Sequence, residues 1–289
     1  MPIMLADVKN SYWSFESYFR PDLWSRPGGV LSNNDGCFIA RNDKLKSLDI
    51  KMGAPYFKVK DFLEEHEAKI FSSNFPLYCN MSDRLMRILK SFTPKLEVYS
   101  VDEAFLDLAG LPIKDYESYA REVCSQIKDQ IGLTVRVGIG PSKTLAKAAQ
   151  EFSKKNISLK GICVLMDSCS QKRALKEISV EEIWGIGAKQ SAKLRALGIK
   201  TALEFRDYKN EKNIQNIFTK LGRITQEELR GEKILEVENQ SPKKKEILVS
   251  RSFGHPIYDI GTLKEAVANF ITKACEKLRR QKSLASVTG

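Results

Sequence analysis

The stretch VYSVDEAFLDLAG, residues 98–110, decides how the rest of this chain is interpreted. Its β-branched, aromatic and aliphatic residues are typical of a largely buried strand or hairpin. Asp102 and Glu103 nevertheless stand in its middle. Adjacent carboxylates repel each other and are costly to remove from water unless a positive charge lies nearby. The stretch therefore predicts a strand whose acids face a cation, the alternative being an exposed hairpin turn with solvated acids.

The flanking segments alternate between strand and helix patterns. We predict, in order, strand 3–7, helix 12–19, helix 82–92, strand or hairpin 95–108, helix 116–131, strand 133–140 and a helix from 143 to about 152 capped by Ser142. This order favours an α+β fold with an antiparallel or mixed sheet and helices on one face. Its strand ends would bring Asp7 to the acidic pair.

The C-terminal part of the sequence is organised differently. Residues 170–235 read as a separate all-helical region, in which IWGIGAKQSAKLRALGI has the form of a helix, a tight glycine turn and another helix. Pro242 lies in a polar, basic stretch that we interpret as a linker over 236–246. A strand at 247–253 and a helix at 262–280 are predicted to follow.

Composition narrows the functional classes. The 289 residues carry a net charge of +11, which favours a polyanionic partner such as nucleic acid or an anionic membrane surface. Two histidines and six cysteines without a C-x-x-C pair argue against zinc, a histidine-based triad and disulfides, and with no signal peptide they favour a cytoplasmic protein. No apolar run approaches the ~20 residues of a membrane span.

Asp7, Asp102 and Glu103 form the main candidate site. Three carboxylates on rigid strands, with no His or Cys nearby in sequence, favour Mg²⁺ or Mn²⁺. Two such ions about 3.5 to 4 Å apart would activate an attacking hydroxyl and stabilise a pyrophosphate leaving group.

Three further features suit phosphate or sugar groups. Lys143, Lys147 and Lys154 share one face of their predicted helix, which meets either a triphosphate or only water. Tyr12 follows Asp7 closely enough to lie beside the sugar of a bound nucleotide, or it is an ordinary packed aromatic. The glycine turn at 185–187 exposes backbone N–H groups at a helix N-terminus, which suits one phosphate without regard to base sequence, and Lys189 would add charge.

Several segments together resemble one family. The segments LADVKNSYWSFE, VLSNNDGCFIARN, FSSNFPLYCNMSDRLM, YSVDEAFLDL, GIGPSKTLAKAA and VEEIWGIGAKQSAKL, in this order, resemble Y-family translesion DNA polymerases. The SNNDGC turn with IARN and the later SRSFG are similar to the UmuC branch rather than to the polymerase IV branch. The resemblance covers residues 3–285.

The resemblance implies a right-hand polymerase. It implies a ferredoxin-like palm (1–10 and 73–168), small fingers (11–72), a helix-hairpin-helix thumb (170–235), the 236–246 linker and a little finger from 247 that is incomplete at residue 289, with no clamp-binding tail.

The resemblance also implies roles for individual residues. Asp7, Asp102, Glu103 and the Val8 carbonyl would hold two metal ions, Tyr12 beside Ser11 would exclude a 2′-hydroxyl, and Lys154 would reach the triphosphate. Many family members carry a Tyr-x-x-Arg pair in the fingers. Here the aligned residues are Asp43 and Lys46, so only Lys46 carries over and Arg41 is its candidate substitute.

The implied function is error-prone DNA synthesis on a primer-template in the SOS response, using dNTPs, with UmuD-like subunits and a RecA-like filament as partners. Two alternatives stay open. One is a truncated, non-catalytic DNA-binding or regulatory fragment of such a polymerase. The other is a nucleotide cyclase on a related palm, which has no GGDEF-type motif here and leaves the helix-hairpin-helix unexplained.

Overall fold

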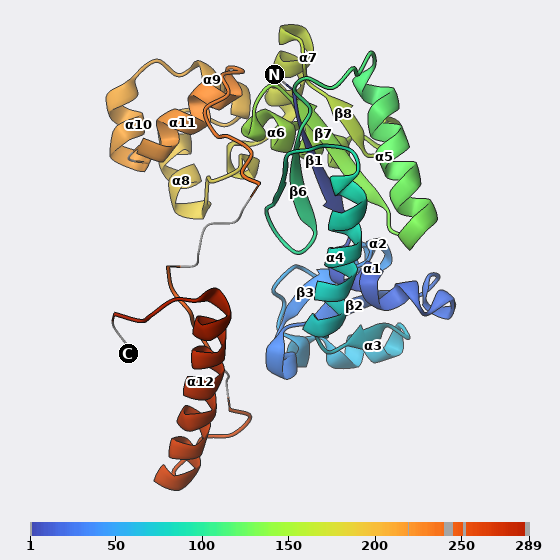
Figure 1. Cartoon of the computed structure of the whole chain (residues 1–289), viewed down its shortest axis with the longest axis vertical. Helices are drawn as coiled ribbons and strands as arrows, with labels where there is room; N and C mark the ends of the chain where they lie inside the picture. Colours follow the sequence, from blue (N-terminus) through green and yellow to red (C-terminus); the bar gives the residue numbers. More distant parts are fainter. Residues whose placement is uncertain (1, 219, 240–244, 251–252, 287–289) are drawn as a thin grey trace. The chain divides into compact units, whose positions relative to one another are not determined.

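The chain folds into two compact units, Met1–Trp24 with Asn74–Gln240 and Ser25–Ser73 with Ser241–Gly289. The computed structural model describes residues 2–218, 220–239, 245–250 and 253–286 (Figure 1). The fold is α+β, as the sequence predicts. Of the helices in these described ranges, none has the length and apolar character needed to span a membrane.

The first unit is built on a five-stranded mixed sheet of order β5-β6-β1-β7-β8, in which only the β7–β8 pair is parallel. Each strand and helix predicted between residues 3 and 152 is present, and the short strand β8 was not predicted. The elements are β1 (Ile3–Val8), α1 (Ser11–Tyr18), α4 (Phe75–Lys90), β5 (Leu96–Val98), β6 (Glu103–Asp107), α5 (Tyr116–Ile131), β7 (Val135–Gly140), α6 (Lys143–Lys155) and β8 (Ile162–Val164).

Capping residues explain two of the helix boundaries. Helix α4 starts seven residues before the predicted position because the Asn74 side chain accepts a hydrogen bond from the Leu77 N–H and Pro76 occupies the first turn. Helix α6 starts after Ser142, whose hydroxyl accepts from the Leu145 N–H at 3.1 Å. The second cap was predicted correctly from the sequence.

The sheet is buried on both faces, so the prediction that helices cover one face only is wrong. All six residues of β1 are buried, and successive side chains of a strand point to opposite faces. Ile3 and Leu5 pack with Phe105 and with Ala146 of α6. Three helices surround the sheet: α6 contacts β1, β7 and β8, α5 contacts β7 and β8, and α4 contacts α5 and β5.

The glycines of β7 allow α6 to lie against the sheet. A Cβ atom on Gly138 would come within 2.1 Å of the Ala146 carbonyl oxygen, and one on Gly140 within 2.8 Å of the Leu145 Cβ. Because only glycine leaves this space empty, the helix backbone approaches the strand directly. The GIG that ends the strand therefore brings the helix close to β1.

The predicted all-helical region is present in the same unit. It consists of α7 (Ser168–Glu177), α8 (Ala188–Ala196), α9 (Ala202–Asp207), α10 (Glu211–Phe218) and α11 (Lys220–Leu229), with short 3₁₀ helices at Ile157–Leu159 and Val180–Glu182. Its core is continuous with one side of α6: Leu145 and Phe152 pack with Leu175, Leu194 and Phe205. The helical region is therefore not an independent core, since α6 serves both it and the sheet.

The second unit contains two segments of the chain. Residues 25–73 form a three-stranded sheet of order β3-β2-β4 around Leu31, Phe38, Leu45 and Leu63. Its elements are β2 (Gly28–Leu31), β3 (Phe38–Arg41), α2 (Asp43–Ser47), α3 (Lys60–Glu65), β4 (Lys69–Phe71) and 3₁₀ helices at Asn33–Asp35 and Tyr56–Lys58, and a further 3₁₀ helix, Pro21–Leu23, precedes it in the first unit.

The C-terminal segment contains α12 (Ile260–Gln281), close to the predicted helix. The predicted strand at 247–253 is wrong where it can be assessed, because residues 247–250 and 253 have no strand structure. A short strand is stable only when another strand accepts its backbone hydrogen bonds, and these residues have no such partner among those described. Pro242, the reason for the predicted linker, lies outside the described residues.

Candidate active site

Two of the three candidate carboxylates lie on neighbouring strands, Asp7 on β1 and Glu103 on β6, although they are almost 100 residues apart. Asp102, predicted to lie on a strand, lies in the bend just before β6. Strands β1 and β6 are antiparallel, and the Cα of Asp7 is directly opposite that of Glu103. The Val8 N–H donates to the Asp102 carbonyl oxygen at 3.1 Å. Directly opposed residues of an antiparallel pair have side chains on the same face. The sheet therefore brings the acids together as the sequence predicts.

Each of the three carboxylates receives a hydrogen bond from a different neighbour. Gln150 Nε2 donates to Asp7 Oδ2, and Ser100 Oγ donates to Asp102 Oδ1 at 2.7 Å. Lys147 Nζ lies 3.0 and 3.1 Å from the two carboxylate oxygens of Glu103. The cation that the acidic strand was predicted to face is thus, in this structure, a lysine of α6.

Asp7 is short of positive charge. Asp7 is only 9% exposed. Burial raises the pKa of its carboxyl group from 3.8 to about 7. The Lys154 ammonium opposes this increase, the carboxylates of Glu103 and Asp102 add to it, and Arg136 lowers the pKa slightly. Because the charges of Lys154 and Arg136 do not offset burial and the two neighbouring acids, the surroundings of Asp7 favour an additional cation.

The carboxylates of Asp7, Asp102 and Glu103 fit a hard divalent cation by their chemistry, but they do not form a complete set of ligands in this structure. Among the residues that the structure describes, no three His, Cys, Asp or Glu side chains are gathered closely enough to hold a metal ion. The Glu103 carboxylate is paired with Lys147. Carboxylate oxygens are the ligands that Mg²⁺ and Mn²⁺ prefer. An ion bound by Glu103 would take the place of Lys147 at its carboxylate.

Tyr12 belongs to an aromatic cluster at the start of α1. Its ring stacks on Tyr78 with centroids 4.7 Å apart and meets Phe75 edge-on at 6.1 Å. Burial raises its pKa, and the charge of Asp102 raises it further. The ring is therefore held rigidly within electrostatic reach of the carboxylates, beside half-buried Ser11. The aromatic partners were not identified from the sequence.

The lysine face of α6 is not simply solvated. Lys143, whose side chain is 6% exposed, pairs with Glu97 of β5 at 2.5 Å, and Lys147 pairs with Glu103. Lys154 is more accessible and pairs with Glu151 at 2.9 Å. The solvated-face alternative is therefore wrong for the first two lysines.

Sequence reasoning missed Gln150 and Arg136, both next to Asp7. A signal existed for Gln150, since it lies three residues after Lys147 and four before Lys154, on the same face of the helix. Arg136 is opposite Asp7 in the β1–β7 pair. It could not be found without the register of the strands.

The glycine turn has the conformation expected of a helix N-terminus. Gly185 has φ +86°, and a Cβ there would have open space around it. Gly187 is the N-cap of α8, and Lys189 is exposed in its first turn. The backbone N–H groups at this end are available to an anion.

The two residues predicted to grip phosphates from the fingers lie in the second unit. Arg41, in β3, donates through Nη1 to the Ile50 carbonyl, and its Nε is buried with no hydrogen-bond partner among the described residues. Lys46, in α2, lies 3.4 Å from Asp43. Arg41 thus makes a hydrogen bond within its own unit, and Lys46 pairs with Asp43 at an exposed position.

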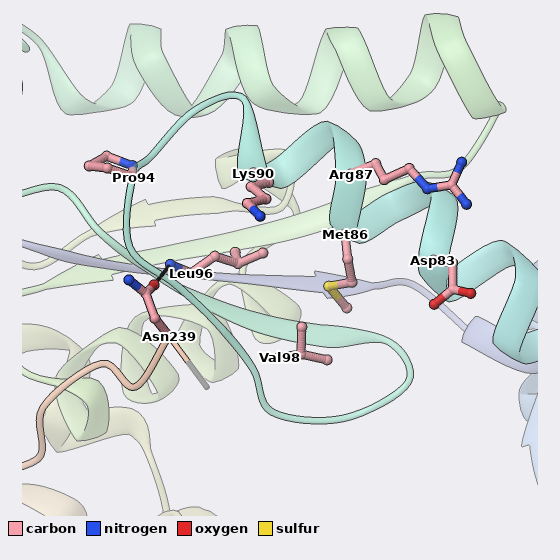
Figure 2. A pocket seen from close by; sticks show the side chains of 8 residues that line it. All are labelled: Asp83, Met86, Arg87, Lys90, Pro94, Leu96, Val98 and Asn239. Carbon is pink, nitrogen blue, oxygen red and sulfur yellow. Dashed lines mark hydrogen bonds between the residues drawn. The ribbon is translucent and has the colours of Figure 1, made fainter. Parts of the chain in front are cut away.

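A groove of about 510 Å³ lies elsewhere, along strand β5 and helix α4. Figure 2 shows Asn239 reaching the backbone of this strand, where its Oδ1 accepts from the Leu96 N–H at 2.8 Å. Its other lining residues are Asp83, Met86, Arg87, Lys90, Pro94 and Val98. None of the three candidate carboxylates lines it, so it is separate from the candidate active site.

The fold and the site define a class, an α+β protein with the fold of Y-family DNA polymerases. Among solved structures, the chain is similar to DinB from Sulfolobus solfataricus, with a TM-score of 0.70 and 26% identity over 83% of this chain and 70% of that one. A Y-family DNA polymerase chimera of Dbh and Dpo4 gives a TM-score of 0.79 at 23% identity over 96% and 80% of the two chains.

The family models for the impB/mucB/samB family and its C-terminal domain match residues 6–151 and 244–288, and the IMS family HHH motif matches residues 168–199. The chain belongs to the impB/mucB/samB family, which confirms the resemblance found in the sequence.

Curated relatives agree with this membership. Protein UmuC of Salmonella typhimurium is 44% identical over 95% of this chain and 65% of its own length, and Protein ImpB of the same organism is 41% identical over 96% and 66%. DNA polymerase IV of Moorella thermoacetica is 31% identical over 79% of this chain and 57% of its own length. The chain spans about two thirds of the length of the UmuC and ImpB relatives.

Proposed function

We propose that this chain catalyses template-directed nucleotidyl transfer as an error-prone DNA polymerase of translesion synthesis. The observation that carries the proposal is the pairing of Asp7 with Glu103 across β1 and β6, next to Asp102. Similarity to proteins named DNA polymerase IV and to Y-family polymerase structures supports it. The substrates are a primer-template and dNTPs.

The proposed cofactor is a pair of Mg²⁺ ions, which Mn²⁺ could replace. Asp7, Asp102, Glu103 and the Val8 carbonyl would hold them. When bound, such ions activate the attacking hydroxyl and stabilise the pyrophosphate that leaves. The raised pKa of Asp7 supports this assignment, because a divalent cation would favour the ionised carboxylate that the protein alone disfavours.

The remaining residues would position the nucleotide. Tyr12, rigid on Tyr78, would exclude a 2′-hydroxyl by steric contact, with Ser11 beside it. Lys154, whose charge already acts on Asp7, would neutralise the triphosphate. In the fingers, Lys46 and Arg41 would contact the same phosphates.

Primer-template binding would depend mainly on phosphate contacts. The backbone N–H groups after Gly185 and Gly187, with Lys189, suit one phosphate of the duplex. The net charge of +11 supports a polyanionic partner, and affinity should fall steeply as salt is added. UmuD-like subunits, a RecA-like filament, a role in the SOS response and a cytoplasmic location complete the proposal by family analogy.

We also propose the family's division of labour for the chain. Residues 1–10 and 73–168 would act as palm, 11–72 as fingers, 170–235 as thumb, and the residues after the 236–246 linker as part of a little finger. Most of the proposed fingers, Ser25–Ser73, belongs to the second compact unit and not to the unit that contains the proposed palm, which supports a separate fingers domain; residues 11–24 belong to the first unit.

Primer extension tests the proposal. The purified chain should add single nucleotides to a primer-template in Mg²⁺, and Asp102→Asn should reduce the rate on the order of 100-fold or more, because the charge stabilisation of the transition state is lost. Fluorescence anisotropy with labelled duplex checks that the variant still binds DNA. Asp83→Asn, an exposed acid on α4, is the matched control and should extend primers normally.

The same experiment separates the rival function. If the ion pair between Glu103 and Lys147 never opens, Glu103 cannot bind a metal ion. The chain would then be a non-catalytic DNA-binding fragment. Salt-dependent duplex binding without nucleotide addition, by this chain and by a version extended to the full length of its relatives, would establish the rival and refute the polymerase.

A further inference from the structure

Lys147 occupies an unusual position for an ammonium group. Its side chain is 15% exposed, and that of its partner Glu103 is 20% exposed. Its Nζ also lies 4.5 Å from the ring centroid of Tyr99, 5.5 Å from that of Trp184 and 5.8 Å from that of Phe105. A cation within about 6 Å of an aromatic ring is attracted to the ring face. Lys147 is therefore held by three rings and one carboxylate.

Three rings surround the Lys147 ammonium in a cage, which we define as Tyr99, Phe105 and Trp184. Trp184 Nε1 donates to the Tyr99 hydroxyl at 3.0 Å, and the two rings meet edge-on at 5.6 Å. Phe105 is fully buried, and Trp184 packs against the core that contains it. Phe105 and Trp184 thus attach the cage to the core, whereas Tyr99 is 44% exposed.

The cage joins two regions of the first unit. Tyr99 and Phe105 flank the acidic pair on the β5–β6 hairpin, whereas Trp184 immediately precedes the glycine turn that leads into α8. The neighbouring Lys143 lies 5.1 Å from the Phe105 centroid but pairs with Glu97. Of these two lysines, only Lys147 pairs with a carboxylate of the proposed metal site, that of Glu103.

We infer that Lys147, held in the cage of Tyr99, Phe105 and Trp184, is a positioning residue that neutralises Glu103 in the metal-free enzyme and competes with a divalent cation for it. The inference rests on the proposed function, since it takes Glu103 as a metal ligand. It accounts for the absence of a finished three-carboxylate cage among the described residues. Metal entry would exchange the lysine for the ion at the Glu103 oxygens.

Direct Mn²⁺ binding to the full chain, measured by titration calorimetry without DNA or nucleotide, tests this exchange. Lys147→Met keeps the apolar stem in the cage and removes the charge. It should tighten Mn²⁺ binding about tenfold, because a unit charge next to a carboxylate commonly changes its affinity for a cation by at least that factor. Lys147→Arg should restore affinity close to that of the unmodified chain.

Lys143→Met is the matched control, because it removes the same charge one turn earlier on α6 from a lysine paired with Glu97. It should change Mn²⁺ affinity much less than Lys147→Met. Trp184→Leu, which opens the cage and keeps Lys147, should give an intermediate increase. Circular dichroism melting of each variant establishes that the proteins compared are folded.

The outcomes distinguish this inference from the proposed function. If Glu103→Gln abolishes Mn²⁺ binding but Lys147→Met binds no more tightly than Lys143→Met, the metal site stands and the exchange is refuted. If the unmodified chain and Glu103→Gln bind Mn²⁺ equally, the metal site itself fails. Tightening by Lys147→Met, reversed by Lys147→Arg, supports the exchange.

Discussion

Helices α6 and α12 begin from similar sequence patterns and end in opposite environments. Both are amphipathic, and both start at a side-chain N-cap, Ser142 and Asp259. Eight of the 13 residues of α6 are buried. None of the 22 residues of α12 is buried, and its apolar stripe of Leu263, Val267 and Ile271 is 43–57% exposed.

The difference teaches that periodicity creates a helix face without determining what covers it. Helix α6 lies against β7 because Gly138 and Gly140 leave room for its backbone, and its other side contributes to the core of the helical region. Most helical stability in proteins comes from such packing rather than from propensity. Helix α6 should therefore be far more sensitive to substitution than α12.

The largest stability effect should separate the two helices directly. Leu145→Ala in α6 removes a fully buried side chain and should cost about 2–5 kcal/mol, through lost burial and the cavity left behind. Val267→Ala in α12, at a position 45% exposed, should change stability by about 0.5 kcal/mol or less. Urea denaturation followed by circular dichroism measures both. Equal effects would contradict the comparison.

The next effect concerns the charge beside α6. The folded-state pKa of Asp7, about 7, is above its ordinary value of 3.8, so the folded chain binds this proton more tightly than the unfolded chain. The burial of Asp7 therefore does not lower the free energy of unfolding well below pH 4. It lowers this free energy progressively as the pH rises from about 4 to about 7, and by a constant amount at higher pH. The upper limit is about 4 kcal/mol, from roughly three pKa units.

Asp7→Asn should consequently raise the melting temperature at pH 8 in EDTA and leave it nearly unchanged at pH 4. Scanning calorimetry at the two pH values measures this. Saturating Mg²⁺ should reduce the advantage of the variant at pH 8, because the proposed ions stabilise the ionised aspartate. A variant less stable than the unmodified chain at pH 8 would show that burial of Asp7 is already compensated.

The smallest effect compares the two N-caps. Ser142→Ala removes the cap of α6 and the hydrogen bond from its hydroxyl to the Glu228 carbonyl at 2.7 Å, and it should lower global stability by about 1–2 kcal/mol. Asp259→Ala removes the 2.6 Å bond from the Thr262 N–H. It should increase hydrogen exchange in the first turn of α12 and leave the main unfolding transition unchanged. A shift of that transition would show that α12 is packed in solution.

Much of the fold could be predicted from local signals. The strand ending near Asp7, the cap at Ser142 and the helix over Tyr116–Ile131 all follow from apolar period, capping chemistry and glycine positions. Strand β8 could not be predicted, because three residues carry too little periodicity. The strand expected at 247–253 was wrong over its described residues, since a sequence with strand character still needs a neighbour.

The candidate site divides in the same way. The sequence alone identified the three acids and their need for a cation, because carboxylates among apolar residues are costly to bury without a positive charge nearby. Which partner each acid has was decided by the tertiary structure. Lys147 and Glu103 are 44 residues apart, and Gln150 and Asp7 are 143 apart. Such contacts depend on strand register and on how closely α6 approaches the sheet, and no local pattern of residues contains those distances.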